Sequence, residues 1–175
     1  MRMLNAHVEL TRLHVSDIEQ VREWRNAPHI SKHMLSKTYI TEEMQKNWFD
    51  SLDDDTNFYF VIHVQGKKVG VVSIKDINFQ LQTAEPGIFI AETQHSLPQT
   101  PFGAALLLND FAFNTLKLKK LVMRMLDNNK KAMRFNRTLG YVAKKTVSAE
   151  QYTLYELTAD RYNQKKQQIE KLLAS

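Results

Sequence analysis

Apolar residues recur at helical spacing in two segments near the N-terminus. The first covers residues 16–26 and opens with the capping-box pattern Ser16-Asp17-Ile18-Glu19, which predicts a helix. Pro28 excludes its continuation. The second covers residues 41–52, where a threonine followed by two glutamates suits the positive end of a helix dipole. Two helices are therefore expected after a first strand near residue 7.

Aromatic and β-branched residues dominate the middle of the chain and predict strands. Residues 58–64 and 68–79 flank a short Gln-Gly-Lys turn, which is typical of a hairpin. A third run, at 84–91, extends the hairpin to three antiparallel strands. Strands and helices in this order predict a mixed α/β domain with one central sheet.

The second half of the chain alternates helix and strand patterns. Residues 103–116 are apolar nearly all round, which indicates a helix buried against the sheet. The apolar run 121–126 suits a buried strand. It leads into a helix with one apolar face that Gly140 ends, and then into another strand, so these three elements form a βαβ unit. A last strand is predicted at 152–157.

The length of 175 residues and the 43% hydrophobic content suit one domain with a sizeable core. We assign residues 1–158 to this domain and residues 159–175, which show a polar helical pattern, to a C-terminal helical extension. No internal repeat or linker divides the chain.

Composition narrows the classes of function. Cysteine is absent, and the six histidines show no spacing that would place two on one helix face, so we expect no metal site. No apolar run is long enough for a secretory signal or a membrane span, and the expected location is the cytoplasm with no membrane partner.

Positive charge is concentrated in one part of the chain. The net charge is +5, and residues 117–137 alone contain eight basic residues and one acidic residue. Such a cluster suits a ligand with several phosphates, because Lys and Arg pair with phosphate oxygens. A solvated helix face is an equally simple explanation of most of these residues. A nucleic-acid partner is not expected, because aromatic residues are not interleaved with the basic ones.

Residues 129–141 resemble a motif of the GNAT superfamily of acyl-CoA N-acyltransferases. The pattern is Asn129, two residues, the small Ala132, and a helix that ends in Leu139-Gly140-Tyr141. The likeness extends from about residue 7 to residue 157, with the elements in the order of that family. It implies acetyl-CoA as co-substrate and a mostly antiparallel central sheet flanked by helices, with a V-shaped splay between neighbouring strands.

The resemblance implies two places that hold the coenzyme. Its pyrophosphate would rest on the amides of loop 98–104 at a helix start, where unpaired donors attract phosphate. Pro101 replaces a family glycine there and removes one donor. Pantetheine would lie like an extra strand in the splay. The residues implied are Phe89, Ile90 and Ala91 for pantetheine, Thr100, Phe102, Gly103 and Ala104 for the pyrophosphate, and Asn129, which also suits a helix N-cap, with Asn136.

Acyl transfer to an amine needs a base for the amine and an acid for the departing thiolate. Asn136 stands where the family usually carries its acidic tyrosine, so Tyr141 or solvent is expected to take that role. Glu85 occupies the place where related enzymes carry a glutamate base, and a carboxylate beside a buried cleft would have a raised pKa. The competing interpretation of Glu85 is a solvated acid at a strand end.

The stretch Trp24-Arg25-Asn26-Ala27-Pro28 and the residues after it resemble GNAT enzymes that acetylate nucleotide-linked amino sugars, notably in pseudaminic acid synthesis. The resemblance implies that Arg25 pairs with the diphosphate and that His33, Met34 and Tyr39 line the acceptor pocket. The same turn occurs in ribosomal-protein alanine acetyltransferases.

The sequence therefore predicts an acetyl-CoA-dependent N-acetyltransferase that acts on a UDP-linked amino deoxy sugar, a small-molecule amine. One alternative is acetylation of a protein N-terminus or a polyamine, with the acidic loop Asp53-Asp54-Asp55 attracting a cationic acceptor. Another is a catalytically silent coenzyme-binding module that forms a homodimer through its terminal helix.

Overall fold

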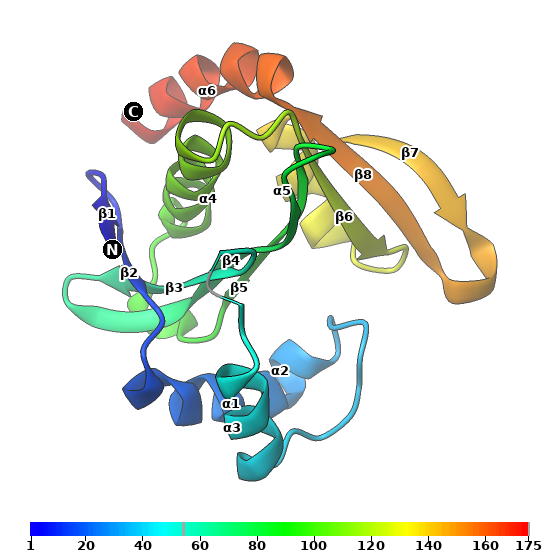
Figure 1. The fold of residues 1–175 in the computed structure, drawn as a ribbon. Helices are drawn as coiled ribbons and strands as arrows, with labels where there is room; N and C mark the ends of the chain where they lie inside the picture. The colour runs from blue at the N-terminus through cyan, green and yellow to red at the C-terminus, as the bar shows by residue number, and fades with distance from the viewer. Residues whose placement is uncertain (54, 175) are drawn as a thin grey trace.

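The computed structural model describes residues 1–53 and 55–174; Asp54 of the acidic loop lies outside them. One sheet of eight strands, in the order β1-β2-β3-β4-β5-β6-β8-β7, forms the centre of the molecule (Figure 1). All neighbours are antiparallel except β5 and β6. The strands are β1 (Arg2–Leu4), β2 (Glu9–Arg12), β3 (Phe58–Val64), β4 (Lys67–Asn78), β5 (Thr83–Ile90), β6 (Lys120–Leu126), β7 (Val142–Val147) and β8 (Tyr152–Thr158).

Helices cover the sheet on both sides, as Figure 1 shows, with α1 to α3 below it and α4 to α6 above it. We name these two sides the α1–α3 face and the α4–α6 face. The predicted mixed and mostly antiparallel architecture is confirmed. The helices are α1 (Ile18–Asn26), α2 (Pro28–Ser31), α3 (Glu42–Asp50), α4 (Thr100–Asp110, continued by a π-helical turn at Phe111–Thr115), α5 (Lys130–Leu139) and α6 (Ala159–Ala174).

Local signals set most helix ends. Thr41 caps α3 by accepting a hydrogen bond from the Met44 amide, as its position predicts. Pro28 ends α1 and opens α2 at the first helical position. The capping box predicted at Ser16 is wrong, because His14 takes the cap position and exchanges bonds with residues of the turn before α1.

The predicted βαβ unit is present only in a split form. Asn129 caps α5, and Gly140 ends it in the left-handed conformation with φ 104°, both as expected. However, β6 and β7 are not neighbours, since β8 lies between them and pairs with both. The last strand of the chain, β8, inserts between β6 and β7. No local sequence pattern predicts this insertion.

Two hydrophobic clusters lie on opposite faces of the sheet. The larger is on the α4–α6 face and includes Phe60, Leu121 and Leu157, all fully buried. The smaller, on the α1–α3 face, consists of Leu13, Val21, Trp24, Val61, Val71 and Ala91. Helix α6 belongs to the larger cluster, since its Tyr162 is fully buried and donates a hydrogen bond to the Leu106 carbonyl of α4.

Candidate active site

Strands β5 and β6 separate soon after they begin. They pair only at Thr83 with Lys120 and at Ala84 with Leu121. Beyond that point β5 stays on β4 and β6 stays on β8. We call the unpaired stretch, residues 85–90 of β5 and 122–126 of β6, the wedge. Ile88, Ile90, Val122 and Met123 along it keep partial exposure.

The backbone of β5 offers hydrogen-bonding groups to the wedge. The Ala91 amide donates to the Val69 carbonyl beside β4, at 2.8 Å. Because backbone groups alternate between the two sides of an antiparallel strand, Phe89 also faces β4, whereas Ile88 and Ile90 face the wedge. Of the predicted pantetheine contacts, only Ile90 therefore has free backbone groups. The amide of Ala91 is already used. Ile88, which the sequence analysis did not single out, faces the wedge in the same way as Ile90.

Pro86 explains where the pairing of β5 and β6 stops. It follows Ala84 in the set of residues that face β6, and it has no N–H to continue the ladder. A proline inside a strand marks an unpaired side. This is the sequence signal that indicates which backbone edge of β5 stays open.

The first turn of α4 offers fewer amide donors than predicted. The Thr100 amide donates to the Leu97 carbonyl at 2.9 Å, and the Gly103 amide makes the first helical bond, to Gln99, at 2.9 Å. Pro101 has no donor. Ala104 lies inside the helix and is fully buried. Of the four donors that a helix start normally leaves free, those of Gln99 and Phe102 remain for a phosphate.

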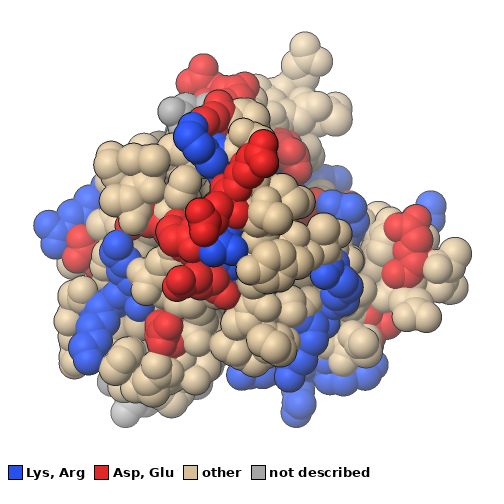
Figure 2. Space-filling view, turned by 90° about the horizontal axis from the view of Figure 1, so that it is seen from below, with Lys and Arg blue, Asp and Glu red and all other residues tan. Residues whose placement is uncertain are grey.

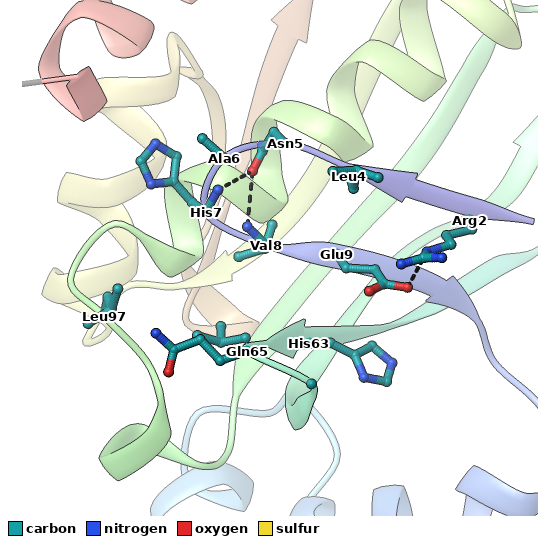
Figure 3. A pocket seen from close by; sticks show the side chains of 12 residues that line it. Arg2, Leu4, Asn5, Ala6, His7, Val8, Glu9, His63, Gln65 and Leu97 are labelled. Atoms are coloured by element: carbon teal, nitrogen blue, oxygen red, sulfur yellow. Dashed lines mark hydrogen bonds and ion pairs between the residues drawn. The ribbon is translucent and has the colours of Figure 1, made fainter.

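Gly103 has a packing role in addition to its expected coenzyme role. The loop between β1 and β2 lies against α4, and the Asn5 side chain donates to the Gly103 carbonyl at 2.9 Å. A Cβ atom at position 103 would come within 3.1 Å of His7 Cβ. The loop thus lies against one side of the α4 N-terminus. Figure 3 shows Asn5 and His7 in this loop, with the Asn5 side chain turned back onto the loop's own backbone.

The residues predicted on α5 occupy different environments. Asn129 caps the helix through Oδ1, which accepts from the Ala132 amide at 3.1 Å. Asn136 is buried and donates to the Ala132 carbonyl at 2.9 Å. Tyr141 lies in the larger core, where burial raises the pKa of its hydroxyl far above the usual range. A hydroxyl held in this way is a poor proton donor to a thiolate, so solvent is the better candidate.

Glu85 lies where the wedge begins, with both carboxylate oxygens paired. Lys75 from β4 is 2.9 Å from Oε1, and Arg124 from β6 is 3.3 Å from Oε2. The second ion pair joins the two strands of the wedge on the side opposite the large core. Glu85 is therefore a held and partly buried carboxylate, unlike the solvated strand-end acid of the competing interpretation.

We call residues 27–41, between α1 and α3 and including the short helix α2, the anchored loop, because its two ends are joined. The Asn26 side chain bonds the Ile40 backbone twice, accepting from its amide at 2.9 Å and donating to its carbonyl at 2.8 Å. Arg22 adds a bond to the same carbonyl and pairs with Glu19. Trp24 is mostly buried and donates to Glu92 at 2.8 Å. The Trp-Arg-Asn turn thus anchors the loop that carries the predicted acceptor residues.

Of the predicted acceptor residues, Arg25 lies in the last turn of α1, and His33, Met34 and Tyr39 lie in this loop. Arg25 is partly buried and Met34 is partly exposed, whereas His33 is exposed. Tyr39 is 65% exposed, and its hydroxyl accepts a bond from Arg22. His33 is largely exposed, yet partial desolvation of its imidazole lowers its pKa, and the positive charges of Lys32, Lys37 and Lys131 lower it further.

Tyr59 is a site candidate that the sequence analysis missed. It projects from β3 on the α1–α3 face, and its ring meets Trp48 edge-on with centroids 5.0 Å apart. Burial raises the pKa of its hydroxyl, on which Arg25 and Glu85 also act electrostatically. Its proximity to both predicted residues depends on strand register, which explains why no local motif indicates it.

Two further findings concern metals and membranes. Among the described residues, no group of His, Asp or Glu is arranged to hold a metal ion. None of the helices in the described chain combines the length and apolar character needed to span a membrane.

The chain belongs to the GNAT acetyltransferase family, since residues 7–142 match the model of the acetyltransferase (GNAT) domain. A spermidine N(1)-acetyltransferase of Escherichia coli K12 is 28% identical over 141 residues, which cover 79% of this chain and 75% of that protein. The acetyltransferase PseH of Campylobacter jejuni 81-176 is 25% identical over 157 residues, 87% of each chain.

Solved structures share the fold at low sequence identity. Spermidine N-acetyltransferase from Vibrio cholerae, in complex with CoA and spermine, aligns with a TM-score of 0.80 at 18% identity over 91% of this chain and 99% of that one. FdhC, a nucleotide-linked sugar GNAT, aligns with a TM-score of 0.81 at 18% identity over 96% of each chain. As a member of the GNAT acetyltransferase family, the protein is an N-acetyltransferase that uses acetyl-CoA.

Proposed function

We propose that this enzyme transfers an acetyl group from acetyl-CoA to an amino group of a UDP-linked amino deoxy sugar. The observation that carries the proposal is a group of cations at the loop that bears the acceptor residues. Lys32, Lys37 and Lys131 all lie close enough to His33 to act on its charge. We call Lys32, His33, Lys37 and Lys131 the cationic rim.

The cationic rim combines residues that are far apart in the sequence. Lys32 and Lys37 belong to the anchored loop, whereas Lys131 belongs to the first turn of α5, just after β6. A diphosphate placed there would meet several positive charges at once, which favours an anionic acceptor. A polyamine would meet repulsion at the same place.

The chemistry assigns roles to residues beside the wedge. The backbone groups of Ile88 and Ile90 hold the pantetheine arm. The amine nitrogen attacks the thioester carbonyl and forms the amide bond, while the carbon–sulfur bond breaks. Glu85 takes the amine proton directly or through water, and the thiolate takes a proton from solvent. Arg25 and Tyr59 line the acceptor side of this position. The proposal includes the cytoplasmic location expected from the sequence.

A polyamine acceptor is the second candidate, and a specific observation favours it. Figure 2 shows acidic side chains gathered near the middle of the face seen from below, where α1 and α3 cover the sheet, with Lys and Arg at its lower right. Glu19, Glu42, Glu43 and Asp50 belong to these helices. Spermidine acetyltransferases are also among the relatives.

Release of CoA thiol from acetyl-CoA tests the proposal against this candidate. We expect turnover with a UDP-linked amino deoxy sugar and little with spermidine or a peptide with N-terminal alanine. The same amino sugar without UDP serves as the control, and its KM should be at least about tenfold higher if the rim holds the diphosphate. Turnover with spermidine alone would replace the proposal by the second candidate.

A further inference from the structure

Gly87 leaves a small recess in the sheet. It lies inside β5, with Ser73 of β4 as its register partner and Tyr59 of β3 next in the same row. Val71, two residues before Ser73, belongs to the smaller cluster, so side chains of this row project on the α1–α3 face. Apart from the adjoining residues of β5, a Cβ atom at position 87 would meet one heavy atom of the described chain within 4 Å, the Ser73 Oγ at 2.7 Å. Glycine inside a strand often marks a place where a ligand comes close to the backbone, and we call this space the Gly87 recess.

Ser73 presents an unpaired hydroxyl to the Gly87 recess. The residue is only 7% exposed, and its side chain makes no hydrogen bond within the part of the chain that the structure describes. A buried polar group without a partner costs stability, and native proteins keep few of them. A ligand group that donates a hydrogen bond at the recess would supply the missing partner, whereas a methyl group would not.

The Gly87 recess lies among the groups that the proposed function places on the acceptor side. Residues two positions apart share one face of a strand, so Glu85 and Phe89 flank Gly87 along β5. Tyr59, at the end of the row, is close enough to Arg25 and Glu85 for both to act on the pKa of its hydroxyl. The recess is therefore next to the proposed base, on the strand that borders the wedge.

We propose that the Gly87 recess receives the attacking amino group of the acceptor and that Ser73 orients it. One N–H of the neutral amine donates to the Ser73 Oγ, which leaves the nitrogen lone pair free to point at the thioester carbonyl carbon. The other proton passes to Glu85, directly or through water, as the carbon–nitrogen bond forms and the carbon–sulfur bond breaks. Ser73 neither gains nor loses a proton. The inference rests on the proposed acceptor side of the sheet, and it holds for a sugar amine and a polyamine alike.

Ser73→Ala removes the hydroxyl and keeps the recess open. Release of CoA thiol is measured with the UDP-linked amino deoxy sugar and with spermidine. We expect kcat/KM for the acceptor that turns over to fall by about tenfold, as the loss of one ordinary hydrogen bond implies. Ser73→Thr, which keeps a hydroxyl, should retain more of the activity. The Kd for CoA from calorimetric titration should stay unchanged, and the Tm should not fall, because no bond within the protein is lost.

Thr153→Val is the matched control for the loss of a buried hydroxyl. Thr153 of β8 is also 7% exposed, but its hydroxyl donates to Asp127 Oδ1 at 2.7 Å. Removal of this bond leaves a carboxylate oxygen without its partner, so the Tm should fall while kcat/KM for the acceptor stays unchanged. The two variants should therefore show opposite patterns of activity and stability.

Gly87→Ala fills the recess with a methyl group and keeps the fold. The backbone of Gly87 is outside the left-handed region, and the nearby Ser73 Oγ can rotate away from the methyl group. We expect kcat/KM for the acceptor to fall further than in Ser73→Ala, because the amino group is displaced from the thioester. The double variant Ser73→Ala/Gly87→Ala removes the tight contact but not the methyl group, so its activity should stay low.

Three results would overturn the inference. One is an unchanged kcat/KM for the acceptor in Ser73→Ala. Another is a loss of activity in Ser73→Ala together with a lower Tm and weaker CoA binding, which would indicate a structural role. The third is recovery of activity in the double variant, which would show that Gly87→Ala acts only by pushing on Ser73. Turnover with spermidine in place of the sugar would replace the proposed function and leave all of these readouts intact.

Discussion

The two faces of the sheet differ in how they are built. The α4–α6 face carries the large core and the expected coenzyme contacts, whereas the α1–α3 face has a core of six residues under an anchored loop. In the site that we propose, fixed backbone geometry holds the coenzyme, which the family shares. Side chains on a loop hold the acceptor, which is the part that the proposal and its second candidate assign differently.

Glu85→Gln should have the largest effect on activity. It tests whether the general base of the reaction lies on the α1–α3 face of the sheet. Loss of a general base lowers kcat by about 100-fold or more, while the affinity for CoA should stay nearly unchanged. Steady-state kinetics and calorimetry give the two values. Glu156→Gln is the matched control. Glu156 has the same 23% side-chain exposure as Glu85 and is likewise paired with two cations, in its case Lys120 and Lys144. Equal turnover in both variants would remove Glu85 as the base.

Leucine truncations compare the two cores directly. Leu157 is fully buried in the large core, and its replacement by alanine should cost about 4 kcal/mol of unfolding free energy. Leu13, at 7% exposure in the small core, should cost about 2 kcal/mol, because a site near the surface collapses more easily. Urea unfolding gives both values. Equal costs would show that the two faces are packed alike.

Lys131→Glu probes the cationic rim. Charge reversal should raise the KM for a UDP-linked amino sugar by about tenfold with little change in the KM for acetyl-CoA. Lys119→Glu, an exposed position before the wedge, is the charge-matched control. A lower KM for spermidine in Lys131→Glu would support the proposed repulsion between the cationic rim and a polyamine. Equal effects of the two substitutions would mean that only net charge matters.

His33 should give the smallest effect, seen as a dependence on pH. Its pKa is lowered, so the imidazole is neutral at pH 7, and a bound diphosphate favours the protonated form. Affinity for a UDP-linked N-acetylated sugar, which has no titrating amine, should therefore rise as the pH falls from 8 to 6, by less than about tenfold. His33→Gln should abolish this trend. A trend that survives the substitution would exclude His33.

Local patterns in the sequence predicted the parts that depend on neighbours along the chain. Asn129 and Gly140 mark the ends of α5 because capping and the left-handed conformation are local requirements. The anchored loop at Asn26 and the contact of Glu85 with Arg124 join distant segments, and no spacing indicates them. The capping box failed at Ser16 because His14 competes for the same role.

The open edge of β5 could be predicted from the sequence only in part. A proline within an otherwise regular strand pattern indicates that one side of the strand is unpaired, yet it does not say which partner is absent. The parallel register with β6 supplies that information, because only Thr83 and Ala84 find partners before Pro86. Locating the open edge of β5 therefore requires the sheet topology as well as the proline in the sequence.

Amide hydrogen exchange in β5 tests most directly whether the wedge receives the coenzyme as an additional strand. Without ligand, the Ile88 and Ile90 amides should exchange fast, and the Phe89 amide, which faces β4, should exchange slowly. Saturating CoA should slow Ile88 and Ile90 and leave Phe89 unchanged. Slow exchange at Ile88 and Ile90 in the free protein, or no slowing with bound CoA, would contradict the account.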